Sequence, residues 1–464
     1  MLKSVHRTAV INVVGLTREM IGAHTPHLEN FSKQGELHSL RSVFPSVTCP
    51  VQATFTTGLL PSSHGCVANG WYFRDLSEIL FWKQSNKLVE GEKIWDTAKK
   101  IEPGFTCANM FWWYNMYSTV DFSVTPRPMY LADGRKIPDI YTEPPELRYE
   151  LSRILGQFPL FHFWGPNAGI VSSEWIAKAS KIVFEKYQPS LTLIYLPHLD
   201  YNLQRLGPYH PDLVKDVEKI DTLCGDLIQY FLEKDVRVII LSEYGITPVS
   251  HAIHINRLLR EAKYLRVREE MGLELLDPGA SEAFAVADHQ IAHVYIKNPD
   301  NIPKVRHLLE QCPGIEAVLG KKEKESLGID HKHSGELVAI SAANSWFTYY
   351  YWLDDNRSPD FARIVEIHRK PGYDPVELFL NPKIRFPKLF IAWKLIKKKL
   401  GFRTLLDVIP LDSSLVKGSH GRIPDSVHSG PIFMTNTTGI AEKEIVNAVD
   451  IKEYILKHLF DKKI

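Results

Sequence analysis

The sequence has few cysteines, and their spacing indicates no disulfide pairs and no metal-ligand pairs. Its 464 residues contain five, none in a Cys-x-x-Cys pattern. An odd number without that pattern indicates neither a disulfide framework nor a zinc site built from thiolates. This composition fits a reducing compartment best, so we expect a cytoplasmic protein.

The sequence also lacks an excess of charge of either sign and a long uninterrupted apolar run. Lys and Arg number 55 and Asp and Glu number 54, a balance that gives no electrostatic bias toward a nucleic acid polymer. Residues 154–173 lack all four of these residue types, but prolines, glycines and polar side chains interrupt them and argue against a membrane span. The N-terminus shows no apolar segment followed by a small-residue cleavage site, so we expect a soluble protein without a signal peptide.

What the sequence does have is enough apolar residues, 44%, for a large core. Short apolar runs alternate with helical patterns. The predicted strands are 8–14, 37–43, 104–110, 191–196 and 236–241, and the predicted helices are 25–34, 50–57, 91–100, 174–187 and 210–234. This alternation predicts an α/β fold with a central, mostly parallel sheet covered by helices on both faces.

One domain over residues 1–464 is the simplest organisation. Within it we expect three departures from the regular alternation. These are an irregular insertion at 111–172, a small β excursion at 265–300, and an insertion at 355–415 that contains a basic amphipathic segment.

The segment 44–65, FPSVTCPVQATFTTGLLPSSHG, has the form of a hydroxyl group presented at the start of a helix. Pro50 suits a first helical turn, which places Thr48 near the N-cap. Unpaired amides and the positive end of the helix dipole favour a phosphate group there. Thr48 is therefore a candidate nucleophile. The alternative is that it merely caps the helix.

Two acidic residues share this setting, because Asp200 and Glu243 also follow predicted strands. Ligands of parallel α/β sheets gather beyond the carboxyl ends of the strands. We therefore expect Thr48, Asp200 and Glu243 to line one crevice.

These motifs, in this order, resemble the nucleotide pyrophosphatase/phosphodiesterase branch of the alkaline phosphatase superfamily. The segment around Thr48 is similar to its active-site Thr-x-Pro turn. Further landmarks are TPHLENFSKQG (25–35), YLPHLDYNLQRLGP (195–208), LSEYGITPV (241–249), HKHSGELVAI (331–340) and GSHGRIP (418–424). The resemblance implies an alkaline-phosphatase-like fold and a metal-assisted phosphoester or phosphodiester hydrolase with a threonine nucleophile. It also implies a small phosphorylated metabolite or nucleotide as ligand.

The resemblance further implies a divalent metal, zinc, although the number of ions stays open. The family holds two zinc ions about 4 Å apart. Thr48, Asp200 and His420 match its metal-binding positions. At the other positions the chain has Val14 for an Asp, Gln204 for a His, and Glu243-Tyr244 for an Asp-His pair. Valine cannot bind a metal, and a Gln carbonyl or Tyr phenol is a poorer zinc ligand than imidazole, so we expect at least one ordinary zinc site to be absent or rebuilt.

Two interpretations of these replacements remain open. In the first, catalysis is lost and the chain is a scaffold or binding protein for an anionic phosphorylated metabolite. In the second, other side chains complete a modified metal site. Glu366 and His368 are the leading candidates for that second role, since they face one side of an extended segment. A solvent-facing pair is the plainer alternative. The segment ADHQIAH (287–293) also offers ligand types, but a polar hairpin turn explains it as well.

Aromatic clusters and basic residues suggest the character of the pocket. Trp71, Asn115 and Arg127 are candidate substrate-binding residues, although most of the aromatic rings must belong to the core. The segment 383–403 combines eight Lys and Arg residues with large apolar ones. Such a segment favours peripheral contact with an anionic membrane or a lipid phosphate. The alternative is a surface helix whose apolar face packs on the domain.

Overall fold

The computed structural model describes residues 5–461 and is built around one nine-stranded sheet. Its order is β23 (Ile445–Asn447), β2 (Glu36–Arg41), β22 (Ile432–Thr435), β11 (Arg237–Leu241), β1 (Thr8–Val13), β10 (Leu191–Leu196), β5 (Cys107–Met110), β6 (Phe122–Pro126) and β9 (Ile140–Glu143). All strands are parallel except β22 and β9. The five strands expected from sequence are all present and all parallel.

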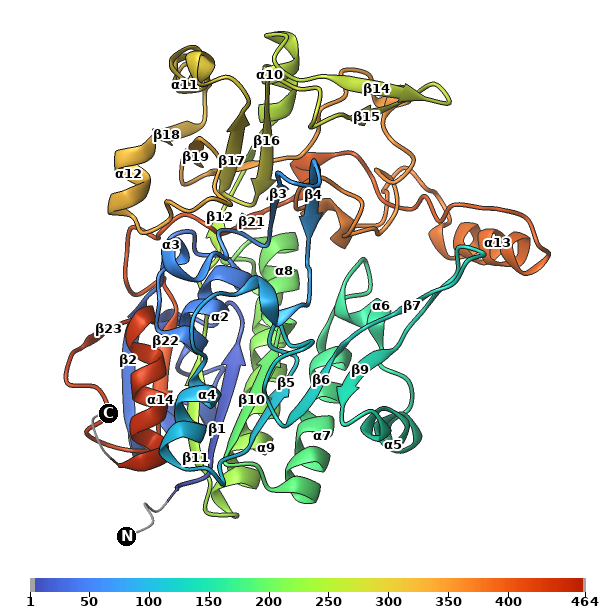
Figure 1. Ribbon diagram of the computed structural model, residues 1–464. Helices are drawn as coiled ribbons and strands as arrows, with labels where there is room; N and C mark the ends of the chain where they lie inside the picture. Colours follow the sequence, from blue (N-terminus) through green and yellow to red (C-terminus); the bar gives the residue numbers. More distant parts are fainter. Residues whose placement is uncertain (1–4, 462–464) are drawn as a thin grey trace.

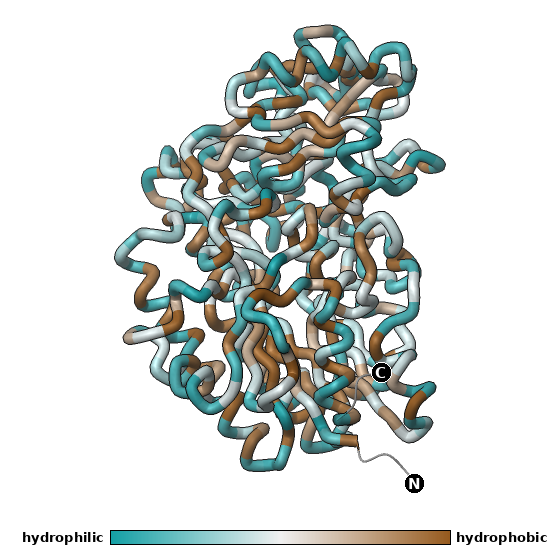
Figure 2. The backbone as a smooth tube through the Cα atoms, turned by 90° about the vertical axis from the view of Figure 1, so that its left-hand side faces the viewer, coloured by the Kyte–Doolittle hydropathy of each residue, from teal (hydrophilic) through white to brown (hydrophobic). Residues whose placement is uncertain are grey.

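Helices cover both faces of this sheet (Figure 1). One layer consists of α1 (Pro26–Gln34), α7 (Ile170–Tyr187) and α9 (Val214–Leu232), and the other of α2 (Thr48–Thr57), α4 (Ile94–Ile101) and α14 (Ile451–Phe460). The central strands β1, β10 and β11 are almost entirely buried, because a strand covered on both faces has no solvent side. Figure 2 shows apolar segments in the interior and hydrophilic ones in the outer turns.

A second, smaller body of chain stands above the carboxyl ends of the sheet (Figure 1). Its four-stranded antiparallel sheet has the order β16 (Ala283–Asp288), β17 (Ile291–Ile296), β19 (Leu337–Ser341) and β18 (Ile315–Leu319). Around it lie α10 (Ile255–Glu261), α11 (Ile302–Glu310), α12 (Lys321–Ser326) and the hairpins β3 (Gly70–Phe73) with β4 (Glu78–Phe81) and β14 (Val267–Glu270) with β15 (Leu273–Leu276). This body has its own hydrophobic core and is larger than the expected excursion at 265–300.

The segment 111–172 is more regular than expected. It contributes β6 and β9 to the edge of the main sheet, and α5 (Glu146–Leu155) and α6 (Leu160–Phe163) follow. The hairpin β7 (Met129–Tyr130) with β8 (Lys136–Ile137) extends outward from it. Short runs of two to five strand residues, rich in proline and aromatics, gave too little periodicity for a strand prediction.

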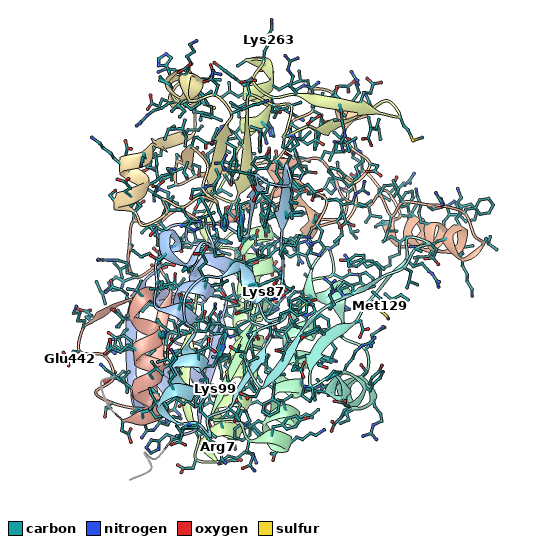
Figure 3. The ribbon with its side chains drawn as sticks, viewed as in Figure 1. Arg7, Lys87, Lys99, Met129, Lys263 and Glu442 are labelled. Atoms are coloured by element: carbon teal, nitrogen blue, oxygen red, sulfur yellow. The ribbon has the colours of Figure 1, made fainter. Side chains whose placement is uncertain are left out.

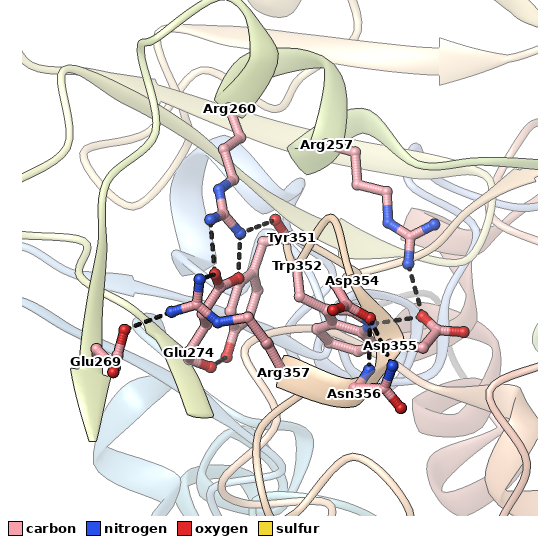
Figure 4. A network of polar contacts seen from close by, with 10 residues as sticks. All are labelled: Arg257, Arg260, Glu269, Glu274, Tyr351, Trp352, Asp354, Asp355, Asn356 and Arg357. Carbon is pink, nitrogen blue, oxygen red and sulfur yellow. Dashed lines mark hydrogen bonds and ion pairs between the residues drawn. The ribbon is translucent and has the colours of Figure 1, made fainter. Parts of the chain in front are cut away.

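An ion-pair network joins the hairpin β14–β15 to the chain that follows β20 (Ser345–Phe347) (Figure 4). Arg260 binds both carboxylate oxygens of Glu274, one at 2.9 Å. Arg357 bridges Glu269 and Glu274, so one buried carboxylate holds two guanidinium groups. The network anchors the start of the segment 355–415, which carries α13 (Pro387–Lys399).

Candidate active site

Thr48 is the first residue of α2 and presents its side chain to the crevice. The N-cap is Val47, and no side chain caps this helix. The hydroxyl of Thr48 instead lies 3.2 Å from the phenol oxygen of Tyr244. The interpretation of Thr48 as a mere helix cap is therefore wrong, and its hydroxyl is available for another role.

Thr48 begins a chain of hydrogen bonds through the residues that replace the family's metal ligands. The phenol of Tyr244 donates to Asp200 Oδ1 at 3.2 Å, so the Thr48 hydroxyl is left to donate to Tyr244. The amide of Gln204 donates to Asp200 Oδ2 at 2.7 Å. The Tyr373 hydroxyl donates to the side-chain oxygen Oε1 of Gln204 at 2.9 Å. The two replacements, Tyr244 and Gln204, thus satisfy both oxygens of the retained Asp200.

Burial sets the protonation of this chain. Burial raises the pKa of Asp200 to about 7, against the smaller opposing effect of its bonds from Gln204 and Tyr244. Burial also raises the pKa of Tyr244 well above its ordinary value, so Tyr244 stays a phenol and can donate. Asp200 therefore exchanges a proton near neutral pH, as a general base requires.

Glu243 lies beside this chain with partners of its own. Its Oε1 accepts from Asn12 Nδ2 at 2.6 Å and from Gln52 Nε2 at 2.5 Å. Burial raises its pKa to about 8, which keeps it largely protonated at neutral pH. Gln52 in turn accepts from the amide of Trp113 at 2.7 Å. Glu243 is thus held by amide groups, and a neutral carboxyl is a poor metal ligand.

Two histidines complete the floor of the site. Nδ1 of His420 lies 2.9 Å from the carbonyl of Ser46, and Nδ1 of His289 lies 2.7 Å from Asp288. Their rings are 3.8 Å apart, and Nε2 of both is buried without a hydrogen-bond partner among residues 5–461. Burial lowers the pKa of both imidazoles well below the ordinary value, so both are neutral. His289 sits in the turn between β16 and β17, at a positive φ of 61°.

This donor set does not fit the two-zinc arrangement that the resemblance implies. Val14 offers no donor, and the oxygens of Asp200 are taken by Tyr244 and Gln204. Within residues 5–461, no group of three or more His, Cys, Asp or Glu side chains is placed to hold a metal ion. The structure does bring Asp200 and His420 together, with Oδ1 and Nε2 3.9 Å apart.

The insertion at 366–374 reaches the crevice, but not in the predicted way. Glu366 and His368 line the cavity described below, yet they form no metal group with Asp200 and His420. Nδ1 of His368 lies 3.2 Å from the carbonyl of Phe81 instead. Tyr373 makes the contact with the site, by bonding Gln204 and stacking on His289 at 3.6 Å.

The three candidate substrate-binding residues separate in the structure. Arg127 lines the cavity. Trp71 is buried and stacks on Phe73 and His333, and does not line the cavity. Asn115 is fully buried and donates to the carbonyls of Asn109 and Val124. Trp71 and Asn115 were therefore wrong predictions, because their neighbours use them as core and loop-fixing residues.

A cavity of about 980 Å³ opens over Thr48 and Asp200. Its wall is mostly apolar and aromatic, with Trp82, Trp113 and Trp164 among its residues. The basic side chains on its wall are Lys83, Arg127, Lys136, Arg369, Lys394 and Lys398, and the acidic ones are Asp200 and Glu366. The excess of positive charge suits an anionic ligand, and the apolar wall suits one with a large apolar part.

The sequence did not point to Tyr373 as a site residue, and it offered His289 only as a ligand type that a hairpin turn explained as well. Tyr373 stands one residue before Asp374 in the insertion, and a phenol is not among the usual metal ligands that were predicted there. His289 lies in the segment that a hairpin turn explained, and the turn is indeed present between β16 and β17. The run Asp-His-Gln at the tip of the predicted hairpin was a sequence signal for a site histidine, because a residue at a hairpin tip can project from the sheet.

Comparison with known proteins bears on this site. The model of the type I phosphodiesterase / nucleotide pyrophosphatase family matches residues 8–374. The chain belongs to this family. That span includes Thr48, Tyr244, Asp200 and Tyr373, and ends before His420.

Curated relatives match only part of their length. An uncharacterised pyrophosphatase/phosphodiesterase of Schizosaccharomyces pombe is 28% identical over 247 residues, which cover 51% of this chain and 42% of that protein. Human ectonucleotide pyrophosphatase/phosphodiesterase family member 1 is 23% identical over 53% of this chain and 24% of its own length. The matched part therefore spans less than half of either relative.

Solved structures of the same fold cover nearly the whole chain. Murine ectonucleotide pyrophosphatase/phosphodiesterase 5, as an inactive variant in complex with AMP, aligns with a TM-score of 0.61 at 16% identity, over 99% of this chain and 96% of that one. Phosphonoacetate hydrolase of Sinorhizobium meliloti 1021 in complex with phosphonoacetate aligns with a TM-score of 0.64 at 16% identity, over 98% and 96%. The fold is thus alkaline-phosphatase-like, as predicted.

Proposed function

We propose that the protein is a phosphoester or phosphodiester hydrolase with Thr48 as nucleophile. The observation that carries this proposal is the hydrogen-bonded series Thr48, Tyr244 and Asp200 at the floor of a basic cavity. Membership of the family supports the reaction class. AMP bound by the murine relative supports a nucleotide as one candidate ligand.

In this mechanism Thr48 Oγ1 attacks phosphorus and the bond from phosphorus to the leaving oxygen breaks. The Thr48 proton passes to the Tyr244 oxygen while the phenolic proton of Tyr244 passes to Asp200. The leaving oxygen takes a proton from solvent. Water then attacks the phosphothreonine and gives up a proton to solvent, the bond from phosphorus to Thr48 Oγ1 breaks, and Asp200 returns its proton to Thr48 through Tyr244. Arg127 and Lys83, on the cavity wall, would pair with the phosphate oxygens.

A divalent metal is the expectation that family membership carries, and zinc is a finer prediction. The residues present do not fit two zinc ions, so the proposed attack and proton transfer rest on the chain's own side chains. Elemental analysis of protein purified without chelators tests this directly. We expect less than one zinc per chain, and two per chain would refute the altered site.

The hydrolase proposal is tested by a screen of soluble nitrophenyl phosphomonoesters, phosphodiesters and sulfate esters, with and without divalent ions. Turnover of a phosphate ester that Thr48→Ala abolishes would support it. Thr56→Ala is the matched control, since Thr56 lies on the same helix and bonds only the backbone carbonyls of Gln52 and Ala53. Equal turnover by Thr48→Ala and the wild type would reject Thr48 as the nucleophile.

A second candidate is a binding protein for an anionic phosphorylated metabolite without turnover. Tyr244 favours it, because its ring stacks on His420 and its hydroxyl occupies the space between Thr48 and Asp200. Calorimetric binding of AMP or phosphate, with no turnover of any ester in the screen, would decide for this candidate.

We also infer a cytoplasmic location. The absence of any disulfide among residues 5–461 is compatible with it, since the five cysteines are free. No helix in that range is long and apolar enough to cross a membrane.

A further inference from the structure

Helix α13 carries an exposed apolar stripe that belongs to none of the hydrophobic clusters formed by residues 5–461. In Figure 1 it projects from the body of the protein at the end of an arm, and no residue of this helix is buried. Apolar residues recur along this segment at spacings of three and four, which places them on one helix face. They are Phe386, Leu389, Trp393, Ile396 and Leu400, each between 50% and 69% exposed.

The surroundings of the stripe are strongly basic. The segment 383–403 contains eight Lys and Arg residues and no Asp or Glu. Such a charge repels a second copy of the same helix and attracts an anionic surface. Large apolar side chains flanked by lysines are the pattern of helices that lie in the interface of an anionic bilayer.

Another side of α13 lines the cavity that leads to Thr48. Ile391, Lys394, Leu395 and Lys398 belong to its wall. Phe390 and Ile391 of this helix pack against a hydrophobic cluster of the domain. The alternative raised from the sequence, a helix whose apolar face packs on the domain, therefore holds for these two residues and is wrong for the stripe. The helix has two uses at once, because one side closes the cavity while the other faces outward.

The mouth of this cavity carries further exposed rings. Tyr130 on β7 is 49% exposed and Phe161 on α6 is 57% exposed, and both line the cavity. Met129, labelled on the same hairpin in Figure 3, is also exposed. Exposed apolar side chains on three separate elements, α13, β7 and α6, thus belong to elements that line one cavity.

We propose that α13 docks the protein on an anionic phospholipid bilayer and that the cavity accepts an amphiphilic phosphoester from it. The apolar wall would hold the hydrocarbon part of the substrate, and the basic residues would guide its phosphate to Thr48. The substrate class rests on the proposed function, whereas the docking does not. The reaction is attack of Thr48 on the phosphorus of the ester, with a lipid alcohol as leaving group.

Vesicle co-sedimentation tests the docking. The probes are vesicles of phosphatidylcholine alone and of equimolar phosphatidylcholine and phosphatidylglycerol. We expect binding to the anionic vesicles that weakens as salt is added. The stripe variant Leu389→Ser/Trp393→Ser/Ile396→Ser should bind at least about tenfold less, since each side chain loses apolar burial in the interface.

A matched control removes three apolar residues elsewhere that are at least as exposed as the stripe residues: Tyr149→Ser/Tyr209→Ser/Met271→Ser. It should bind anionic vesicles as the wild type does. Equal binding by the wild type and the stripe variant would overturn the proposal. So would a stripe variant that changed only the oligomeric mass in solution, because the stripe would then be a contact between copies of the chain.

The substrate arm separates this proposal from the hydrolase proposal. The stripe variant should keep turnover of a soluble nitrophenyl phosphodiester and lose turnover of a long-chain phosphodiester presented in anionic vesicles. Thr48→Ala should lose both activities and bind vesicles normally. Stripe-dependent binding without turnover of any ester would support the docking and refute the hydrolase. Equal vesicle turnover by the wild type and the stripe variant would refute the substrate class.

Discussion

The rings of Tyr244 and His420 lie parallel, with centroids 3.6 Å apart and planes 8° apart. His420 is a position the family uses for metal, and Tyr244 stands where the family has a second histidine. The stack holds the Tyr244 hydroxyl between Thr48 and Asp200. In the mechanism that we propose, a phenol in this place turns a pair of metal positions into a route for a proton.

Tyr244→Phe tests that route. It keeps the stack on His420 and removes only the hydroxyl, so the hydrogen-bonded link from Thr48 through Tyr244 to Asp200 is lost. We expect kcat to fall by about 10²-fold or more, the range of positioned acid–base groups, with little change in thermal stability. Tyr454→Phe, which removes the hydroxyl of a buried tyrosine on α14 that does not line the cavity, is the control. Unchanged kcat in Tyr244→Phe would exclude the relay.

Gln204→His tests the account of the missing metal site. With histidine there, Asp200 and His420 would gain the third ligand that the family places four residues after the aspartate. We expect bound zinc to rise toward one ion per chain, measured by elemental analysis. Gln229→His, on the exposed side of α9, should change nothing. A Gln204→His protein with no more zinc than the wild type would contradict the account that the missing histidine leaves this site incomplete.

The pH dependence of turnover follows from Asp200. Burial raises its pKa to about 7, and the group must be ionised to accept the proton relayed from Thr48. Turnover should therefore rise as pH increases through about 7 and level off above it. A pH–rate profile of kcat on a soluble ester measures this. A profile that is flat through pH 7 would remove Asp200 as the base.

Stability should depend on pH through Glu243. Its pKa is about 8 when folded and 4.5 as an ordinary value, so between these values the folded state binds more protons than the unfolded one. The stabilisation is full below pH 4.5 and is lost as pH rises to about 8. Glu243→Gln keeps an acceptor for Asn12 and Gln52 and removes the titration. Its advantage over the wild type in urea unfolding should grow from pH 5 to pH 8, and a constant difference would contradict the buried, neutral carboxyl.

The sequence predicted the framework of the site better than its chemistry. The strands before Asp200, Glu243 and Thr48 were readable because buried parallel strands are continuous apolar runs. That Thr48 and Asp200 line one cavity followed from the topology of such sheets, whereas Glu243 is fully buried behind its wall.

The partners of these residues were not readable. That Tyr244 would bond Thr48, or Tyr373 would bond Gln204, depends on packing between segments far apart in the chain. His368 was predicted as a metal ligand because imidazole is a common one, but its imidazole faces the carbonyl of Phe81. Pattern alone cannot tell a projecting side chain from a buried one, which is why Trp71 and Asn115 were misassigned.

The most direct test of the central claim is to trap the phosphorylated enzyme. The wild type is mixed with a soluble nitrophenyl phosphodiester, quenched in acid within one turnover, digested and examined by mass spectrometry. The account predicts a phosphorylated adduct on Thr48 that is absent from Thr48→Ala and accumulates in Tyr244→Phe only slowly. Turnover by the wild type with no adduct on Thr48, and with the same rate in Thr48→Ala, would contradict it.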